Sequence, residues 1–248
     1  MSKTDNIYIK KARRKRLIKR LIGIFIVLVA IGIFVVFKTD MFLINKVECK
    51  GDDVVTGDYI RERTNKLKGE NIFTFDKDGI ILELKKNPYV KKVEITRTLP
   101  KKIIINVVES KGLFYIVDGT ENGIISSDLR LLERSSNIDT SNLIEIKGID
   151  ISNVKIGDTI DKDTRLNTIL NELYDQQGVI KDYKEDFLIT SVNLGDLSNI
   201  KVYLNNIEVR VGTDENLRSK MNGAVAVYKS GLATEYIDVS FKGTPDFK

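Results

Sequence analysis

Apolar residues form one uninterrupted run near the start of the chain, at residues 21–37, which only Gly23 and Gly32 dilute. In a helix these 17 positions would rise by about 1.5 Å each and span roughly 25 Å, close to the apolar thickness of a bilayer. A buried soluble helix would show a polar face, and a cleaved signal peptide would place small residues after Phe37; the sequence has neither. The run therefore predicts a single transmembrane helix.

The two sides of this run carry different charge. Residues 1–20 hold nine Lys or Arg against Asp5 alone, whereas the remaining 228 residues hold 31 basic and 34 acidic groups. Because basic residues stay on the cytoplasmic side of a membrane helix, we expect the tail of residues 1–20 inside the cell and residues 38–248 outside it. The tail suits anionic membrane lipid, with a nucleic-acid or acidic partner as the alternative. The outer region shows no basic excess, so we expect no nucleic-acid binding there.

In residues 44–110 the spacing of apolar residues alternates between that of strands and that of helices, and it predicts the order of the elements. The expected elements are a strand at 44–50, a turn at 51–53, a helix from Thr56 to Gly69, a helix from Asp76 to Pro88, and strands at 93–97 and 103–107. This β-α-α-β-β order predicts a small α+β domain with two helices on one face of its sheet. The last strand, at 102–108, is expected either to remain open or to join the next domain.

Residues 111–248 predict a β-rich domain with two helices. The expected elements are strands at 113–117, 124–132, 143–149, 187–194, 200–204, 207–211 and 234–242, a helix from Asp161 or Asp163 that ends before Gly178, and a helix at 217–228. Asn205-Asn206 is expected to form a tight hairpin, since Asn tolerates positive φ. Asp214 and Glu215 are expected in the first turn of the last helix, where they would favour its dipole.

Two motifs resemble the FtsQ/DivIB family of bacterial cell-division proteins. One is Asn87-Pro88-Tyr89-Val90-Lys91-Lys92-Val93-Glu94-Ile95 with Arg97, Pro100, Ile103, Ile105, Val107 and Glu109 following. The other is Thr234-Glu235-Tyr236-Ile237-Asp238-Val239-Ser240-Phe241 with Gly243-Thr244-Pro245 following. The resemblance implies a POTRA domain at 44–110 and an FtsQ-type β domain at 111–248.

Catalytic chemistry has little support in the composition. The chain has no histidine and one cysteine, Cys49, which excludes His-dependent triads and thiolate zinc sites. The Ser-x-x-Lys spacings at Ser152 and Ser198 occur without the Ser-Asp-Asn and Lys-Thr-Gly elements of penicillin-binding enzymes. We therefore expect no enzyme activity, no metal and no cofactor.

The closing segment, at 234–242, is the candidate binding site. If it is an exposed edge strand, a partner can extend the sheet by β-augmentation. Residues 236, 238 and 240 would then lie on one face of the strand and residues 237, 239 and 241 on the other. We expect partner binding at Tyr236, Asp238, Ser240, Phe241 and Gly243, with completion of the core as the alternative role of these residues.

The resemblance implies a non-enzymatic scaffold at the division septum. Its expected partners are FtsB/DivIC and FtsL-type division proteins and, through them, the septal peptidoglycan synthase complex. Two alternatives stay open: a POTRA-type component that grips polypeptides in protein transport, and a membrane-bound enzyme acting on the cell wall.

Overall fold

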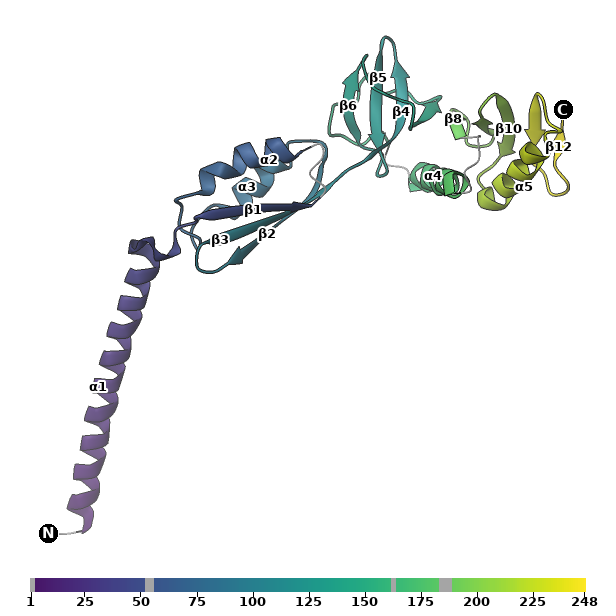
Figure 1. Ribbon diagram of the computed structural model, residues 1–248. Helices are drawn as coiled ribbons and strands as arrows, with labels where there is room; N and C mark the ends of the chain where they lie inside the picture. The colour runs from purple at the N-terminus through teal and green to yellow at the C-terminus, as the bar shows by residue number, and fades with distance from the viewer. Residues whose placement is uncertain (1–2, 52–55, 162–163, 183–188) are drawn as a thin grey trace. The chain divides into compact units, whose positions relative to one another are not determined.

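The computed structural model describes residues 3–51, 56–161, 164–182 and 189–248. It confirms the predicted α+β class and forms two compact units (Figure 1). The first unit comprises Met1–Leu84 and Lys92–Val107, and the second comprises Lys85–Lys91 and Val108–Lys248. The predicted turn residues Asp52 and Asp53, the cap candidate Asp163 and the expected strand start at Phe187 lie outside the described residues.

The first unit begins with a long helix, α1 (Lys3–Lys38), which continues the apolar run back into the basic tail. Its portion Arg16–Lys38 has 23 residues and is long and apolar enough to cross a membrane. At about 1.5 Å per residue this portion spans about 34 Å, slightly more than the roughly 30 Å hydrocarbon core. Its apolar side chains are exposed, as expected for a helix whose solvent is lipid.

A three-stranded sheet covered by two helices follows α1 (Figure 1). In chain order the elements are η1 (Asp40–Phe42), β1 (Lys46–Gly51), α2 (Gly57–Thr64), η2 (Asn65–Leu67), α3 (Lys77–Leu84), β2 (Val90–Thr98) and β3 (Lys102–Glu109). This is the predicted β-α-α-β-β order. The strand order is β1-β3-β2, with β1 parallel to β3. The predicted last strand is therefore central in its own sheet, so it is neither open nor shared with the second unit.

The predicted helix and strand faces form the core of the first unit. The buried side chains include Ile60, Leu67, Ile80, Leu84, Val93, Ile95, Ile103, Ile105 and Val107. They recur at helical spacing along α2 and η2 and on α3, and at every second residue on β2 and β3, so the helices bury their apolar faces on one side of the sheet.

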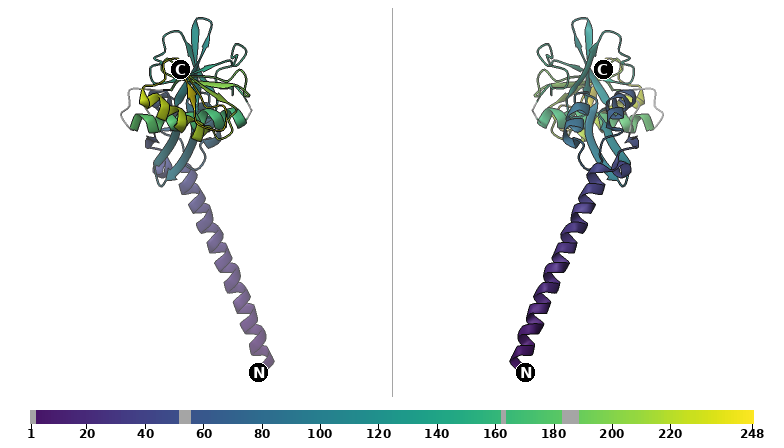
Figure 2. Two further views of the ribbon diagram at one scale, coloured as in Figure 1. Left: turned by 90° about the vertical axis from the view of Figure 1, so that its right-hand side faces the viewer. Right: turned by 90° about the vertical axis from the view of Figure 1, so that its left-hand side faces the viewer.

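The second unit is built on a nine-stranded sheet of order β12-β11-β10-β9-β8-β7-β4-β5-β6. Its elements are β4 (Gly112–Asp118), β5 (Glu121–Ser126), β6 (Leu131–Ser135), β7 (Ile144–Lys147), α4 (Thr164–Asp182), β8 (Ile189–Asn193), β9 (Ile200–Leu204), β10 (Ile207–Gly212), α5 (Leu217–Ser230), β11 (Tyr236–Asp238) and β12 (Asp246–Phe247). Helices α4 and α5 lie along the same side of the sheet (Figures 1 and 2).

The core of the second unit fills the space between these helices and the sheet. Its helix residues are Leu166, Ile169, Leu170 and Leu173 on α4 and Leu217, Met221 and Ala224 on α5. The predicted hairpin between β9 and β10 is present, and Asn205 takes a φ of 51°. The periods read from the sequence therefore identified the faces that pack.

Three expected boundaries in the second unit are wrong. The apolar run at 124–132 is two strands, because Ser126 Oγ accepts a hydrogen bond from the Arg130 N–H (3.1 Å) and closes a turn between them. Helix α4 continues past Gly178 to Asp182. Asp214 and Glu215 precede α5, whose first turn contains no acidic residue.

Candidate functional site

The closing part of the second unit is a crossover from β10 through α5 to β11. Gly231 ends α5 with a φ of 67°, the left-handed conformation that glycine adopts at helix ends. The chain then returns beside β10, and Val209 pairs with Ile237 in a parallel register. Ile237 and Val239 are buried, so these two residues do complete the core.

The predicted edge strand at 234–242 is shorter than expected and is not an edge. It is a strand only at Tyr236–Asp238, and β12 pairs with its other side. After Asp238 the backbone turns, because the Asp238 carboxylate accepts hydrogen bonds from the Ser240 N–H (2.9 Å) and Oγ–H (2.6 Å). The expected alternation therefore ends at Val239, and Phe241 is 49% exposed although it was expected on the face of Ile237.

Strand β12 is the last strand at one edge of the nine-stranded sheet, next to β11. Lys248 donates its N–H to the Tyr236 carbonyl (3.1 Å) and accepts the Tyr236 N–H on its own carbonyl (3.3 Å). In an antiparallel ladder the backbone groups of neighbouring residues point to opposite sides. The N–H and C=O of Phe247 therefore point away from β11, toward the position of an added strand.

At the opposite edge of the sheet, the chain itself pairs with the start of β6. The Leu131 N–H of β6 donates to the Asp158 carbonyl (2.9 Å), and the Gly157 N–H donates to the Leu131 carbonyl (2.7 Å). The Tyr89 hydroxyl also donates to the Glu133 carboxylate of β6 (2.9 Å). Of the two outer strands, β12 is thus the one better placed to accept a partner strand.

A hollow of about 530 Å³ lies between α5 and the segment at 239–245, which leads into β12. Its lining comprises Asn216, Ser219, Lys220, Gly223, Val239, Phe241, Lys242, Gly243 and Pro245. Phe241 and Pro245 supply apolar walls, and the Lys220 Nζ donates to the backbone carbonyls of Val211 and Thr213 (both 2.9 Å). Gly243 has a φ of 147°, which permits the chain to turn back into β12. The hollow therefore combines apolar walls with polar and basic groups.

A network of charged groups on β9 and β10 holds the ring of Tyr236 in position. The Arg210 guanidinium lies 4.0 Å from the centre of the Tyr236 ring and donates to Glu208 (2.8 Å). Lys201 and the Tyr203 hydroxyl also donate to Glu208, at 3.2 and 3.1 Å. These hydrogen bonds, that from Arg210 first, hold the pKa of the Glu208 carboxyl below its usual value against the effect of burial. Tyr236 is therefore held in place by a network that spans β9, β10 and β11.

The structure thus brings the five predicted residues together but divides them between two surfaces. Tyr236, Asp238 and Ser240 lie on the sheet face and its following turn, whereas Phe241 and Gly243 line the hollow. The sequence reading missed Phe247 and the lining residues Asn216, Lys220 and Pro245. A two-residue strand shows no period, so the sequence carried no pattern that would identify β12.

The serines of both Ser-x-x-Lys spacings lie in loops. The Ser152 N–H donates to Asp150 (2.9 Å) and the Ser198 N–H donates to Asp196 (2.8 Å), so each serine belongs to a local turn. Neither serine begins a helix. Among the described residues, no group of three His, Cys, Asp or Glu side chains could hold a metal ion.

Comparison with known proteins supports the resemblance that the motifs indicate. Residues 42–110 match the family described as a POTRA domain of FtsQ type. The cell division protein DivIB of Clostridium acetobutylicum is 35% identical over 246 residues, which cover 98% of this chain and 97% of that protein. The chain belongs to the DivIB family of cell division proteins.

Further DivIB and FtsQ proteins are similar to this chain. DivIB of Clostridium botulinum is 33% identical over 246 residues, covering 97% of this chain and 94% of its own length. FtsQ of Corynebacterium glutamicum is 25% identical over 114 residues, covering 46% of this chain and 51% of its own length. The predicted family is confirmed, and membership in the DivIB family supports a role in cell division.

Proposed function

We propose that this DivIB-family chain is a non-enzymatic, membrane-anchored scaffold that binds other division proteins outside the membrane. Its proposed partners are FtsB/DivIC and FtsL-type proteins, through which it would act on the septal peptidoglycan synthase complex. The observation that carries this proposal is the outward-facing backbone of β12, which directly follows the segment at 239–245 that lines the hollow. Such an edge can extend into a partner strand, and the hollow can select one of its side chains.

The proposed complex assigns a separate task to each surface. The partner backbone pairs with Phe247 of β12, and a side chain of the partner strand enters the hollow between Phe241 and Pro245. Asp238 and Ser240 hold the turn that leads to Phe241 and the hollow. Tyr236 lies on the face of the sheet opposite to the buried Ile237. The POTRA domain at 44–110 would connect this β domain, at 111–248, to the anchor.

A Phe241→Asp substitution is expected to weaken partner binding about tenfold. It replaces a half-exposed aromatic wall of the hollow with a charge, and aromatic side chains of this kind contribute 1–2 kcal/mol or more to interfaces, where about 1.4 kcal/mol is tenfold. The measurement is a titration of the detergent-solubilised full chain with the outer segment of a DivIC-type protein. Leu232→Asp is the matched control, because Leu232 is 62% exposed and lies outside the hollow. Equal affinities of the two variants for the segment would contradict the assignment.

The proposed orientation places residues 1–20 in the cytoplasm and residues 38–248 outside the membrane, at the division septum. The basic residues before α1 reaches its apolar portion support this orientation. A reporter enzyme that is active only outside the cytoplasm is expected to be active when fused after Lys248 and inactive when fused before Met1. The reverse pattern of activity would show that the orientation is inverted.

A further inference from the structure

Helix α1 joins the first unit without a flexible spacer. The Asn71 Nδ2 donates to the Val36 carbonyl (2.6 Å), and the Thr39 hydroxyl donates to the Val35 carbonyl (2.6 Å). One turn later the Ile72 N–H donates to the Phe42 carbonyl (2.9 Å). The bonds to Val35 and Val36 occupy carbonyls at the end of α1 that the helix itself leaves without donors. The folded domain therefore begins within about one turn of the end of the apolar helix.

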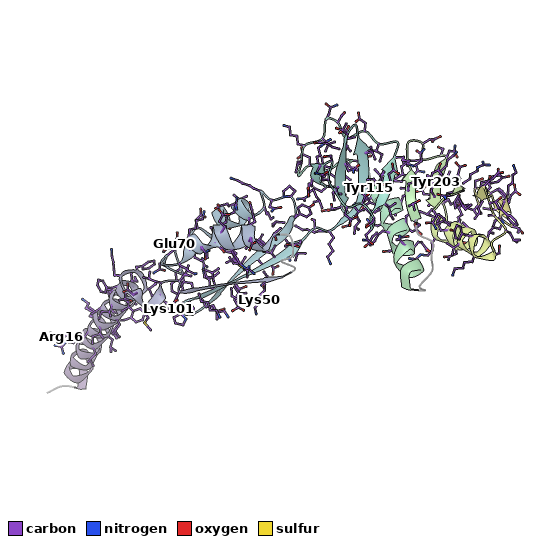
Figure 3. The ribbon with its side chains drawn as sticks, turned by 45° about the horizontal axis from the view of Figure 1, so that its top comes forward. Arg16, Lys50, Glu70, Lys101, Tyr115 and Tyr203 are labelled. Atoms are coloured by element: carbon purple, nitrogen blue, oxygen red, sulfur yellow. The ribbon has the colours of Figure 1, made fainter. Side chains whose placement is uncertain are left out.

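Three segments meet at the end of the domain that α1 enters, and together we call residues 38–45, 69–73 and 98–102 the helix-proximal end. Because β1 and β3 are parallel and Lys46 pairs with Lys102, the turn before β3 lies at the same end as the start of β1. The Asn45 N–H donates to the Lys101 carbonyl (2.9 Å). Figure 3 shows Lys101 and Glu70 next to the end of α1 and Lys50 farther along the domain.

The helix-proximal end exposes most of the large apolar side chains that the domain leaves uncovered. Among the described residues of the first unit beyond α1, four large hydrophobic residues are exposed, and three of them, Met41 (54%), Phe73 (39%) and Leu99 (56%), lie here. The fourth, Leu82 (68%), lies on α3. The Phe42 ring also lies 5.3 Å from that of Phe73. Single exposed hydrophobic residues are ordinary, but a cluster at one end of a domain marks a contact surface.

Charges around this cluster are mixed, with a basic excess at its border. Within the helix-proximal end the exposed basic residues are Lys38 and Lys101 and the exposed acidic residues are Asp40 and Glu70, and one position outside its segments lie the exposed Lys46, Lys68 and Arg97. A small basic excess beside apolar and aromatic side chains is typical of segments that lie at the boundary between headgroups and acyl chains. The composition therefore fits a lipid surface whose contact is mainly apolar.

We propose that the helix-proximal end seats in the outer lipid interface, with Met41, Phe73 and Leu99 inserted between headgroups. This inference rests on the proposed membrane anchoring, since α1 brings these three segments to the bilayer surface. The contact holds the POTRA domain at a defined tilt to the membrane, so its remaining surface faces partners in one orientation.

The chain contains no tryptophan, so a single introduced Trp reports its own environment. The test uses the full chain in vesicles of phosphatidylcholine and phosphatidylglycerol, with or without lipids brominated near the headgroup end of the acyl chains. Variants Leu99→Trp and Phe73→Trp are expected to show blue-shifted emission and several-fold more quenching by brominated lipid than Leu82→Trp. Phe25→Trp, in the apolar part of α1, serves as the anchoring control, and unchanged thermal unfolding of each variant shows that the domain is intact.

The four variants separate this inference from the anchoring on which it rests. The inference is supported if brominated lipid quenches Phe25→Trp, Leu99→Trp and Phe73→Trp but does not quench Leu82→Trp. If Phe25→Trp is quenched while Leu99→Trp and Phe73→Trp behave as Leu82→Trp does, the inference is wrong and the anchoring stands. Equal quenching of Leu82→Trp and Leu99→Trp would mean that the α3 surface of the domain also contacts the membrane, which overturns the inference. Absence of quenching at Phe25 would overturn the anchoring and the inference together.

Discussion

A Phe247→Pro variant is expected to bind the outer segment of a DivIC-type partner about a hundredfold more weakly than the unaltered chain. The Phe247 N–H points away from β11, and proline removes this donor as well as the aromatic ring. A lost hydrogen bond of about 1 kcal/mol and an aromatic contact of about 2 kcal/mol together give roughly this factor. The bonds between Lys248 and Tyr236 do not use the Phe247 N–H, so β12 is expected to stay in place.

Phe247→Val is the matched control for this prediction. It removes the ring but keeps the backbone N–H, so the expected loss of affinity is only about thirtyfold, the factor that corresponds to the aromatic contact of about 2 kcal/mol. Both variants are titrated with the same partner segment, and their thermal unfolding is compared with that of the unaltered chain. If the two variants bind equally well, the backbone of Phe247 does not pair with the partner, and β-augmentation at β12 is wrong.

The parts of this fold that could be read from the sequence are those set by local periods. The packed faces of α4 and α5 recur at helical spacing, and Asn205 supports a hairpin through its own tolerance of positive φ. The family motifs added the POTRA assignment, which residues 42–110 now match. These features depend on neighbours within a few positions along the chain.

The parts that the sequence did not reveal depend on residues far apart. Asp214 was expected to favour the dipole of α5, but it lies before the helix and pairs with Arg165 of α4 at 2.6 Å, 49 positions earlier in the chain. That arginine holds the pKa of the Asp214 carboxyl below its usual value. Likewise, the segment at 234–242 has the apolar alternation of an edge strand, and only the return of β12 shows that a further strand covers it. Strand pairing is set by tertiary contacts, so alternation alone does not identify an edge.

An Ile237→Ala substitution is expected to lower the free energy of unfolding of the second unit by about 2–4 kcal/mol. The Ile237 side chain is fully buried in the core, on a strand whose neighbours are β10 and β12. Truncating a buried isoleucine removes the transfer free energy of its methyl and methylene groups and leaves a cavity, which accounts for a loss of this size. The measurement is urea unfolding of the full chain in detergent micelles, followed by a signal from the second unit.

Tyr236→Ala, one position earlier on β11, is the control that makes this prediction specific. Tyr236 is partly exposed and its ring contacts Arg210, so its truncation is expected to cost only about 1 kcal/mol. The difference arises because adjacent residues of a strand point to opposite faces, and only the face of Ile237 and Val239 meets the core. Equal losses for the two variants would mean that β11 does not divide its side chains in this way. A large loss for Ile237→Ala alone would mean that β11 is held from the core side, which leaves the Tyr236 face and the edge of β12 available to a partner.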